Sequence, residues 1–216
     1  MSKIKYCIWD VGQTIYPYSL NPLNEFCLKN SKNKQALREK SGIKGFDYKP
    51  LMRGDITFSE FCRELCIYAE IDYNKNVENE IDRKLHDGVG NIYPETIKSM
   101  KFLAANKVKN CILSNALPNL NDSTGDLIEK DKAFTSYELG LLKPDPQIFR
   151  AVLHKLEARP QEVIFVDDKP QNVMSAQSLG IRGIVYDRSA VYNDIRHIIK
   201  PDMSHLINQT KSNSRS

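Results

Sequence analysis

The most informative segment of the sequence is Ile4-Lys5-Tyr6-Cys7-Ile8-Trp9-Asp10-Val11-Gly12-Gln13-Thr14. Its first part, Ile4 to Trp9, is a short apolar and β-branched run that ends at an acidic residue, with a glycine shortly after it. This pattern is typical of a buried strand that delivers a side chain to the edge of a sheet. We therefore expect Asp10 to lie at the carboxyl end of a strand.

Similar apolar runs recur along the chain, and segments with helical spacing separate them. The other expected strands cover 108–113, 163–166 and 182–186, with a weaker one at 133–136. The expected helices between them cover 94–106, 146–156 and 173–179, the last one stopping at Gly180. Strands that alternate with helices favour the α/β class, here a Rossmann-like, doubly wound parallel sheet.

A helical insertion interrupts this alternation after the first strand. Between residues 16 and 90 the strand pattern disappears, and Thr57 with Glu60 forms a capping-box pattern that predicts a helix start. We expect residues 16–90 to form a small helical cap domain. The expected α/β core covers 1–15 and 91–207, and a flexible tail covers 208–216.

Two groups of side chains in the insertion are expected to pack inside it. Cys62 and Cys66 can share a helix face, but no neighbouring Cys or His pair completes a zinc pattern. A stripe of larger apolar side chains at helical spacing is more typical of a core than of a ligand platform. The stripe consists of Phe58, Phe61, Leu65 and Tyr68.

The composition favours a globular protein without a nucleic-acid or membrane partner. Lys and Arg number 31 against 27 Asp and Glu, and the basic residues are dispersed rather than gathered in one arm. The N-terminal apolar run is broken by Asp10, unlike a secretory signal or a membrane span. Five cysteines without dense spacing favour a reducing compartment, so we expect a cytoplasmic protein. We also expect a monomer or a homodimer.

Polar residues follow the expected strands, where ligands bind in open α/β sheets. Taken singly, most of them would fit a turn, a cap or a surface role. The adjacent Asp167 and Asp168 are different, because clustered carboxylates repel unless a cation or a basic group compensates them. The candidate site residues are Asp10, Gly12, Thr14, Ser114, Asn115, Lys143, Asp167, Asp168 and Asn172.

The order of these motifs resembles the haloacid dehalogenase superfamily, and particularly its phosphatases that carry a helical cap after the first motif. The resemblance covers nearly the whole chain. The four motifs are Trp9-Asp10-Val11-Gly12-Gln13-Thr14, Leu113-Ser114-Asn115, Leu142-Lys143-Pro144-Asp145-Pro146 with Phe149 beyond, and Phe165-Val166-Asp167-Asp168 with Asn172. Each motif is short, but their joint occurrence in this order is specific.

The resemblance implies a magnesium-dependent phosphatase for a small phosphorylated metabolite, such as a sugar phosphate. Asp10 would be the nucleophile that forms an aspartyl-phosphate. Its carboxylate would share Mg²⁺ with Asp168 and the carbonyl of Gly12, while Asp167 and Asn172 join directly or hold metal-bound waters.

The same resemblance assigns the phosphate-binding groups. Lys143 would neutralise charge on Asp10 and on the phosphate, and Ser114 would bind phosphate oxygens together with nearby backbone N–H groups. Asn115 and Gly12 are expected at the substrate, and Thr14 is expected to orient the loop by hydrogen bonding.

Gly12 departs from the family pattern. Phosphatases of the family usually carry a second aspartate there, which protonates the leaving alkoxide, and such proton transfer contributes roughly 10²–10⁴-fold. Some family members with glycine at this position resemble sugar-phosphate phosphatases, so we expect a preference for good leaving groups such as sugar 1-phosphates or aryl phosphates. An acid from the insertion, His86, Asp55 or Asp87, is a further alternative.

Two other functions stay open. A dehalogenase of the same superfamily would also use the aspartate nucleophile, but it would not need Mg²⁺, and the pair Asp167-Asp168 counts against it. A catalytically impaired protein that binds a phosphorylated ligand would fit the glycine at position 12.

Overall fold

The computed structural model describes residues 3–115, 128 and 132–200, and within them five strands form one sheet. The tail predicted over 208–216 lies outside the described residues. The strands are β1 (Tyr6–Trp9), β2 (Lys109–Ser114), β3 (Ala133–Thr135), β4 (Val163–Asp167) and β5 (Arg182–Val185). Their order is β3-β2-β1-β4-β5, and every neighbouring pair is parallel. The predicted α/β fold with a parallel sheet is confirmed.

The central strand β1 sets the position of the first motif. Cys7, Ile8 and Trp9 are buried, because helices cover both faces of the sheet. Trp9 is in register with Ile112 of β2 and Val166 of β4, and the N–H of Asp10 donates to the Val166 carbonyl at 2.8 Å. Asp10 therefore stands at the carboxyl edge of the sheet, between the ends of its two neighbouring strands.

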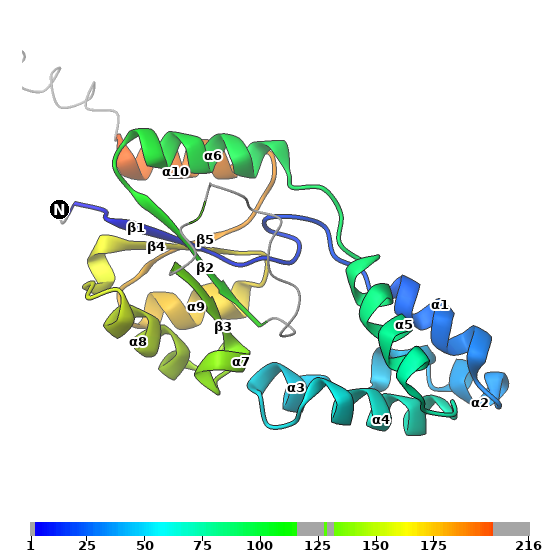
Figure 1. Ribbon diagram of the computed structural model, residues 1–216. Helices are drawn as coiled ribbons and strands as arrows, with labels where there is room; N and C mark the ends of the chain where they lie inside the picture. The colour runs from blue at the N-terminus through cyan, green and yellow to red at the C-terminus, as the bar shows by residue number, and fades with distance from the viewer. Residues whose placement is uncertain (1–2, 116–127, 129–131, 201–216) are drawn as a thin grey trace, which may run out of the picture.

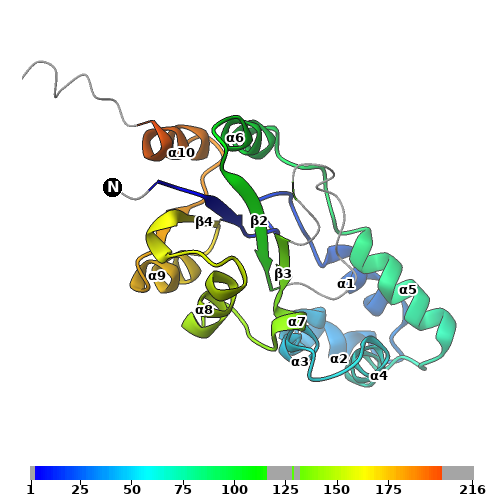
Figure 2. The ribbon, with the colours of Figure 1, turned by 60° about the vertical axis from the view of Figure 1, so that its left-hand side comes forward.

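Helices cover the two faces of the sheet in pairs. On one face lie α6 (Pro94–Ala105) and α10 (Val191–Ile199), and on the other lie α8 (Pro146–Lys155) and α9 (Pro170–Ser178), as Figures 1 and 2 show. The three helices predicted from spacing are confirmed; α9 starts earlier than expected, with Pro170 at its first position, where its missing N–H is not needed. A short 3₁₀ turn, η4 (Pro160–Glu162), leads into β4.

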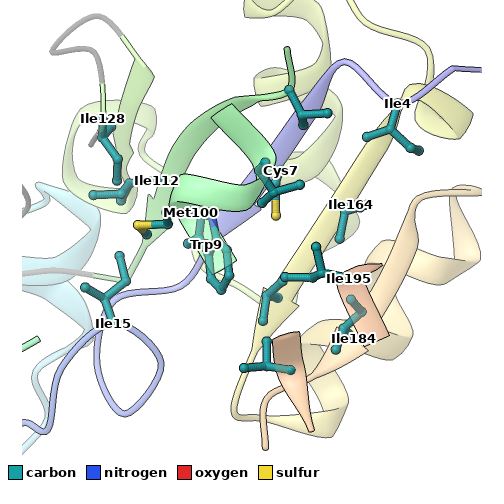
Figure 3. Packing of buried hydrophobic residues seen from close by; sticks show 14 of the residues in the cluster. Ile4, Cys7, Trp9, Ile15, Met100, Ile112, Ile128, Ile164, Ile184 and Ile195 are labelled. Atoms are coloured by element: carbon teal, nitrogen blue, oxygen red, sulfur yellow. The ribbon is translucent and has the colours of Figure 1, made fainter. Parts of the chain in front are cut away.

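Each face of the sheet has its own apolar cluster. Trp9, Met100 and Ile195 belong to the cluster under α6 and α10, which Figure 3 shows from close by. Ile8, Phe149 and Phe165 belong to the cluster on the opposite face. The alternation of Ile8 and Trp9 between the two faces is what a strand with period two requires.

The insertion after β1 is helical and has a third apolar cluster of its own. Its elements are α1 (Asn21–Asn30), α2 (Lys34–Glu39), η1 (Gly42–Gly45), α3 (Lys49–Arg53), α4 (Phe58–Ala69) and α5 (Lys75–His86). The predicted capping box is present: Thr57 Oγ1 accepts from the Glu60 N–H, and Glu60 Oε2 accepts from the Thr57 N–H. Phe61 and Leu65 are fully buried in this cluster, and Phe58 and Tyr68 pack against it.

All five cysteines are buried free thiols, and Cys62 and Cys66 belong to the cluster of the insertion as expected. Within the described residues no helix combines the length and the apolar character that crossing a bilayer requires. The cytoplasmic location stays a prediction.

Two stretches of chain that connect the insertion to the sheet are hydrogen-bonded to each other. The Ser19 N–H donates to the Gly88 carbonyl at 2.9 Å, and the Gly90 N–H donates to the Pro17 carbonyl at 2.9 Å. A Cβ at Gly88 would lie 2.1 Å from the Ser19 carbonyl oxygen, so the close approach requires glycine. The predicted domain boundaries at 16 and 90 fall in this region and stay a prediction.

The insertion also touches the core on a second side. The short helix α7 (Ser136–Leu139) follows β3 and lies beside α3, and the Ser136 hydroxyl donates to the Met52 carbonyl at 2.6 Å. Tyr137 packs against the apolar cluster of the insertion. The insertion is therefore held at its connecting stretches and at α7.

Candidate active site

Three aspartates meet at the carboxyl edge of the sheet. Asp10 follows β1, Asp167 is the last residue of β4, and Asp168 comes next. One carboxylate oxygen from each lies within 4.8 Å of the others. Residues separated by more than 150 positions in the sequence thus form one acidic cluster, because β1 and β4 are neighbours in the sheet.

Lys143 supplies the positive charge of this cluster. Its Nζ lies 2.5 Å from Asp10 Oδ1, 2.8 Å from Asp167 Oδ2 and 2.8 Å from the Leu113 carbonyl oxygen. An ammonium has three protons to donate, so these acceptors use all of them. The side chain is 1% exposed, and removing this ammonium would leave two buried carboxylates without compensation.

Asn115 makes its contacts with the backbone of Lys143. Its Nδ2 donates to the Lys143 carbonyl at 2.9 Å, and its Oδ1 accepts from the Lys143 N–H at 2.9 Å. Both polar atoms of the side chain are therefore engaged with the main chain of the lysine.

The two adjacent aspartates have different surroundings. Both oxygens of Asp167 accept from the Asn172 amide, at 3.0 and 2.9 Å, and Oδ1 also accepts from the Lys169 N–H at 2.8 Å. Asp168 Oδ1 is buried and has no hydrogen-bond partner in the described part of the chain. Asp168 thus has a free ligand oxygen, whereas Asn172 and Lys143 hold Asp167 in place.

The electrostatics of the cluster fit a bound divalent cation. Burial raises the pKa of Asp10, and Asp167 raises it further, while Lys143 lowers it. Burial and the charges of Asp10 and Asp167 raise the pKa of Asp168. A cation at these carboxylates would favour their charged forms. The three aspartates offer the oxygen ligands that Mg²⁺ prefers, and Asp168 Oδ1 is buried without a partner among the described residues.

The backbone conformation at position 12 does not require glycine. Its φ lies outside the left-handed region, and a Cβ built on it would meet only Tyr18 Cβ, at 3.8 Å, an ordinary van der Waals distance. A Cβ would therefore fit at this position, and the backbone tolerates residues other than glycine.

Ser114 and Thr14 flank the cluster. Ser114 is the last residue of β2 and is buried, in register with Thr135 of β3. The Thr14 carbonyl accepts from the Thr96 hydroxyl at 2.8 Å, whereas the Thr14 hydroxyl is buried without a partner among the described residues. The hydrogen bond that Thr14 makes to α6 is therefore made by its main chain, and its role in orienting the loop after β1 stays a prediction.

A model of the haloacid dehalogenase-like hydrolases matches residues 4–180. The chain belongs to this family. Its predicted membership and its hydrolase class are confirmed.

The relatives that match this chain carry different names. The chain is 32% identical over 162 residues to acyl-CoA dehydrogenase family member 10 of Mus musculus. This match covers 69% of this chain and 15% of the mouse protein. It is 36% identical over 70 residues to sesquiterpene phosphatase astK of Aspergillus oryzae, covering 32% of this chain and 36% of that protein. The chain thus spans a small part of the mouse protein and about a third of the fungal one.

A solved structure resembles almost the whole chain. It is a haloacid dehalogenase family enzyme from Bacteroides thetaiotaomicron in complex with magnesium and inorganic phosphate. The TM-score is 0.66 at 25% identity, and the match covers 94% of this chain and 98% of that one. The predicted cofactor is therefore present in a structural relative, and this chain has an aspartate triad at the sheet edge.

The acidic residues of the insertion that could replace a family aspartate at position 12 have partners on the insertion itself. Asp55 pairs with Arg53 at 2.6 Å, and Asp87 pairs with Lys84 at 2.7 Å. His86 Nδ1 lies 2.9 Å from the Asp82 carbonyl. None of the three belongs to the aspartate cluster of the described residues.

Sequence reasoning missed two contributions to the site. The carbonyl of Leu113 accepts from Lys143, and the N–H of Lys169 donates to Asp167. Main-chain groups leave no side-chain signal in a sequence, and only the position of Leu113 beside the Ser114-Asn115 motif could have indicated the first.

Proposed function

We propose that the protein is a magnesium-dependent phosphatase that hydrolyses a small phosphorylated metabolite through a phosphoenzyme at Asp10. The observation that carries this proposal is the Lys143 ammonium, which is buried between Asp10 and Asp167, with the unpartnered Asp168 oxygen in the same cluster. Structural needs alone rarely bury so many charges together, because desolvation costs several kcal/mol per ion.

Asp10 is the proposed nucleophile. A carboxylate oxygen of Asp10 forms a bond to phosphorus while the bond from phosphorus to the ester oxygen breaks; the leaving group departs as an oxyanion and takes a proton from solvent water. Water then attacks the phosphorus and gives up a proton to solvent while the bond from phosphorus to the Asp10 oxygen breaks, which releases inorganic phosphate and restores the carboxylate. Lys143 neutralises charge on Asp10, and its burial holds the ammonium in one place throughout.

The proposed metal ligands are Asp10, Asp168 and the carbonyl of Gly12. Asp167 and Asn172 support the site, since their hydrogen bonds to each other fix the orientation of both. When bound, Mg²⁺ would supply positive charge that relieves the repulsion between a carboxylate and a phosphate dianion. The magnesium and phosphate in the Bacteroides relative support this assignment.

The proposed phosphate contacts come from Ser114 and from backbone N–H groups of the loop after β1. Lys143 already donates its three protons, so a direct bond to phosphate would replace one of its present bonds. The helical insertion 16–90 is the proposed cap, which would exclude water and select the alcohol part of the substrate.

The preferred substrates are phosphates with good leaving groups, such as sugar 1-phosphates or aryl phosphates. A Cβ would fit at Gly12, so no steric need for glycine at this position explains the missing acid. An anomeric or aryl alcohol leaves as a better stabilised oxyanion, and it therefore needs less protonation.

The test is a phosphate-release screen of phosphorylated metabolites and aryl phosphates with Mg²⁺, EDTA and Mg²⁺ added back. Turnover should disappear with EDTA, return with Mg²⁺, and be absent in Asp10→Asn. Stoichiometric labelling of Asp10 in a burst phase would exclude a protein that only binds phosphate. Activity on 2-haloacids that persists in EDTA would overturn the proposal in favour of dehalogenation.

A further inference from the structure

The side chain of Asn115 holds the main chain of Lys143 with both of its polar atoms. The amide oxygen faces the Lys143 N–H and the amide nitrogen faces the Lys143 carbonyl, each at 2.9 Å. The pair of bonds fixes the orientation of the Asn115 amide, because exchanging oxygen and nitrogen would place donor against donor and acceptor against acceptor.

The carboxyl end of β2 therefore fixes both ends of the lysine. Asn115 holds the main chain of Lys143, and two residues earlier the Leu113 carbonyl accepts from its Nζ at 2.8 Å. The residue after Lys143 is Pro144, which has no N–H to donate. The next main-chain donor, Asp145 N–H, bonds to Leu142 within the same turn.

The flexible stem of a lysine places its ammonium only as well as its Cα is placed. Lys143 Nζ has three acceptors at 2.5 to 2.8 Å, and two of them are the carboxylates of Asp10 and Asp167. A small shift of the Lys143 main chain would lengthen these bonds together. Misplacement of a catalytic group by about 1 Å can cost on the order of 10²-fold in rate.

We propose that Asn115 is a positioning residue, which acts on the reaction through Lys143 rather than by touching the substrate. This inference rests on the proposed phosphatase function. It differs from the expectation that Asn115 contacts the substrate directly. In this proposal, Asn115 fixes the main chain of Lys143 through its two hydrogen bonds.

The first experiment measures the contact itself and does not depend on activity. Hydrogen exchange of the peptide covering Leu141 to Asp145 is followed by mass spectrometry. Asn115→Ala removes the acceptor of the Lys143 N–H, so exchange in this peptide should accelerate. Asn106→Ala is the matched control, because the Asn106 amide also donates to a backbone carbonyl, at 2.8 Å, but lies at the far end of α6. It should leave the peptide unchanged.

The second experiment is a double-mutant cycle with p-nitrophenyl phosphate and Mg²⁺. Asn115→Ala should lower kcat by about 10²-fold, with KM changed much less, because the lysine is displaced. In a Lys143→Met background the same substitution should have almost no further effect, since the group that it positions is gone. Asn106→Ala should keep the wild-type kcat.

Asn115→Asp is the second variant if Asn115→Ala does not fold. It keeps the acceptor for the Lys143 N–H but turns an oxygen toward the Lys143 carbonyl, so exchange should stay slow while kcat falls.

Three outcomes would overturn the proposal: unchanged exchange in Asn115→Ala, unchanged kcat, or an equal loss of kcat with and without Lys143. The last would mean that Asn115 touches the substrate. If the wild-type protein turns over no ester, the proposed function fails, and the exchange measurement alone decides whether Asn115 fixes Lys143.

Discussion

The sheet edge and the helical insertion use charge in opposite ways. At the edge, Lys143 and Asp167 are paired with side-chain exposures of 1% and 0%. On the insertion, Lys32 pairs with Asp72 at exposures of 63% and 80%, and Arg83 pairs with Glu80 in the same manner. The insertion also has an apolar cluster, with Phe61 and Leu65 fully buried, and Glu78 is a buried carboxylate beside an exposed lysine, Lys75.

This difference separates function from stability. Exposed ion pairs contribute about 0–1 kcal/mol each, whereas buried ones often contribute no net stability over apolar residues of the same size. The charges at the sheet edge are therefore explained by chemistry, and the insertion is held by its apolar core. Substitutions at the edge should change turnover, and substitutions in the core of the insertion should change the free energy of unfolding.

The largest expected effect is the loss of turnover in Asp10→Asn. Removing a covalent nucleophile should lower kcat by on the order of 10⁴-fold or more. The unfolding temperature should stay the same or rise, because one of three clustered carboxylates is removed. A clear loss of stability would show that Asp10 has a structural role and would weaken the contrast between the two regions.

Phe61→Ala should have the largest effect on stability. Phe61 is fully buried and lies 5.6 Å from the Phe46 ring and 5.9 Å from the Phe58 ring, centroid to centroid. Truncating a buried Phe costs about 3–5 kcal/mol in the free energy of unfolding, which chemical denaturation measures. Ile67→Ala is the control, because Ile67 is 77% exposed on the same helix, and it should be nearly neutral.

Gly12→Asp should change the substrate preference. A Cβ is tolerated at this position, and a carboxyl group there would be able to protonate a poor leaving group, so turnover of alkyl phosphates should rise by about 10²-fold, the lower end of the usual range for a placed acid. Turnover of p-nitrophenyl phosphate should change much less. Equal gains across a leaving-group series would contradict the explanation given for the glycine.

The smallest effect concerns Glu78, a buried carboxylate in the insertion. It accepts from Ser59, Tyr73 and Lys75, and these bonds, that of Lys75 first, lower its pKa to about 2 from an ordinary value of 4.5. A depressed folded-state pKa stabilises the fold above the unfolded pKa, and this stabilisation is lost as the pH falls toward the folded one. Glu78→Gln should therefore have a lower unfolding temperature than the wild type at pH 7, as thermal denaturation measures. The difference between the two unfolding temperatures should disappear as the pH falls from 4.5 to 2. A difference in unfolding temperature that stays constant across this pH range would show that the charge of Glu78 does not contribute to stability.

Most of the fold followed from local patterns. The strand at Ile4 to Trp9, the parallel alternation after residue 94 and the capping box at Thr57 were visible because each depends on residues close in sequence. The meeting of Asp10, Asp167 and Asp168 also followed, since parallel strands bring their carboxyl ends to one edge. Lys143 lies between α7 and α8, and only the family resemblance implied its place beside Asp10.

What could not be predicted depends on contacts between distant segments. Asn115 and Lys143 are 28 positions apart, and nothing in either motif indicates that an amide holds the main chain of the lysine. The same holds for Ser136 and Met52, which join α7 to the insertion. The difference between Asp167 and Asp168 likewise appears only when their neighbours in space are known.

The adjacency of Ser19 and Gly88 has a consequence for how such an architecture can be rebuilt. Because the chain leaves the sheet and returns to it through two points joined by a 2.9 Å hydrogen bond, a turn of a few residues would span the gap. In the path of the chain, residues 20–87 are thus an insertion between two adjacent points. An insertion of another size or shape could connect the same two stretches of chain without altering the path of any strand.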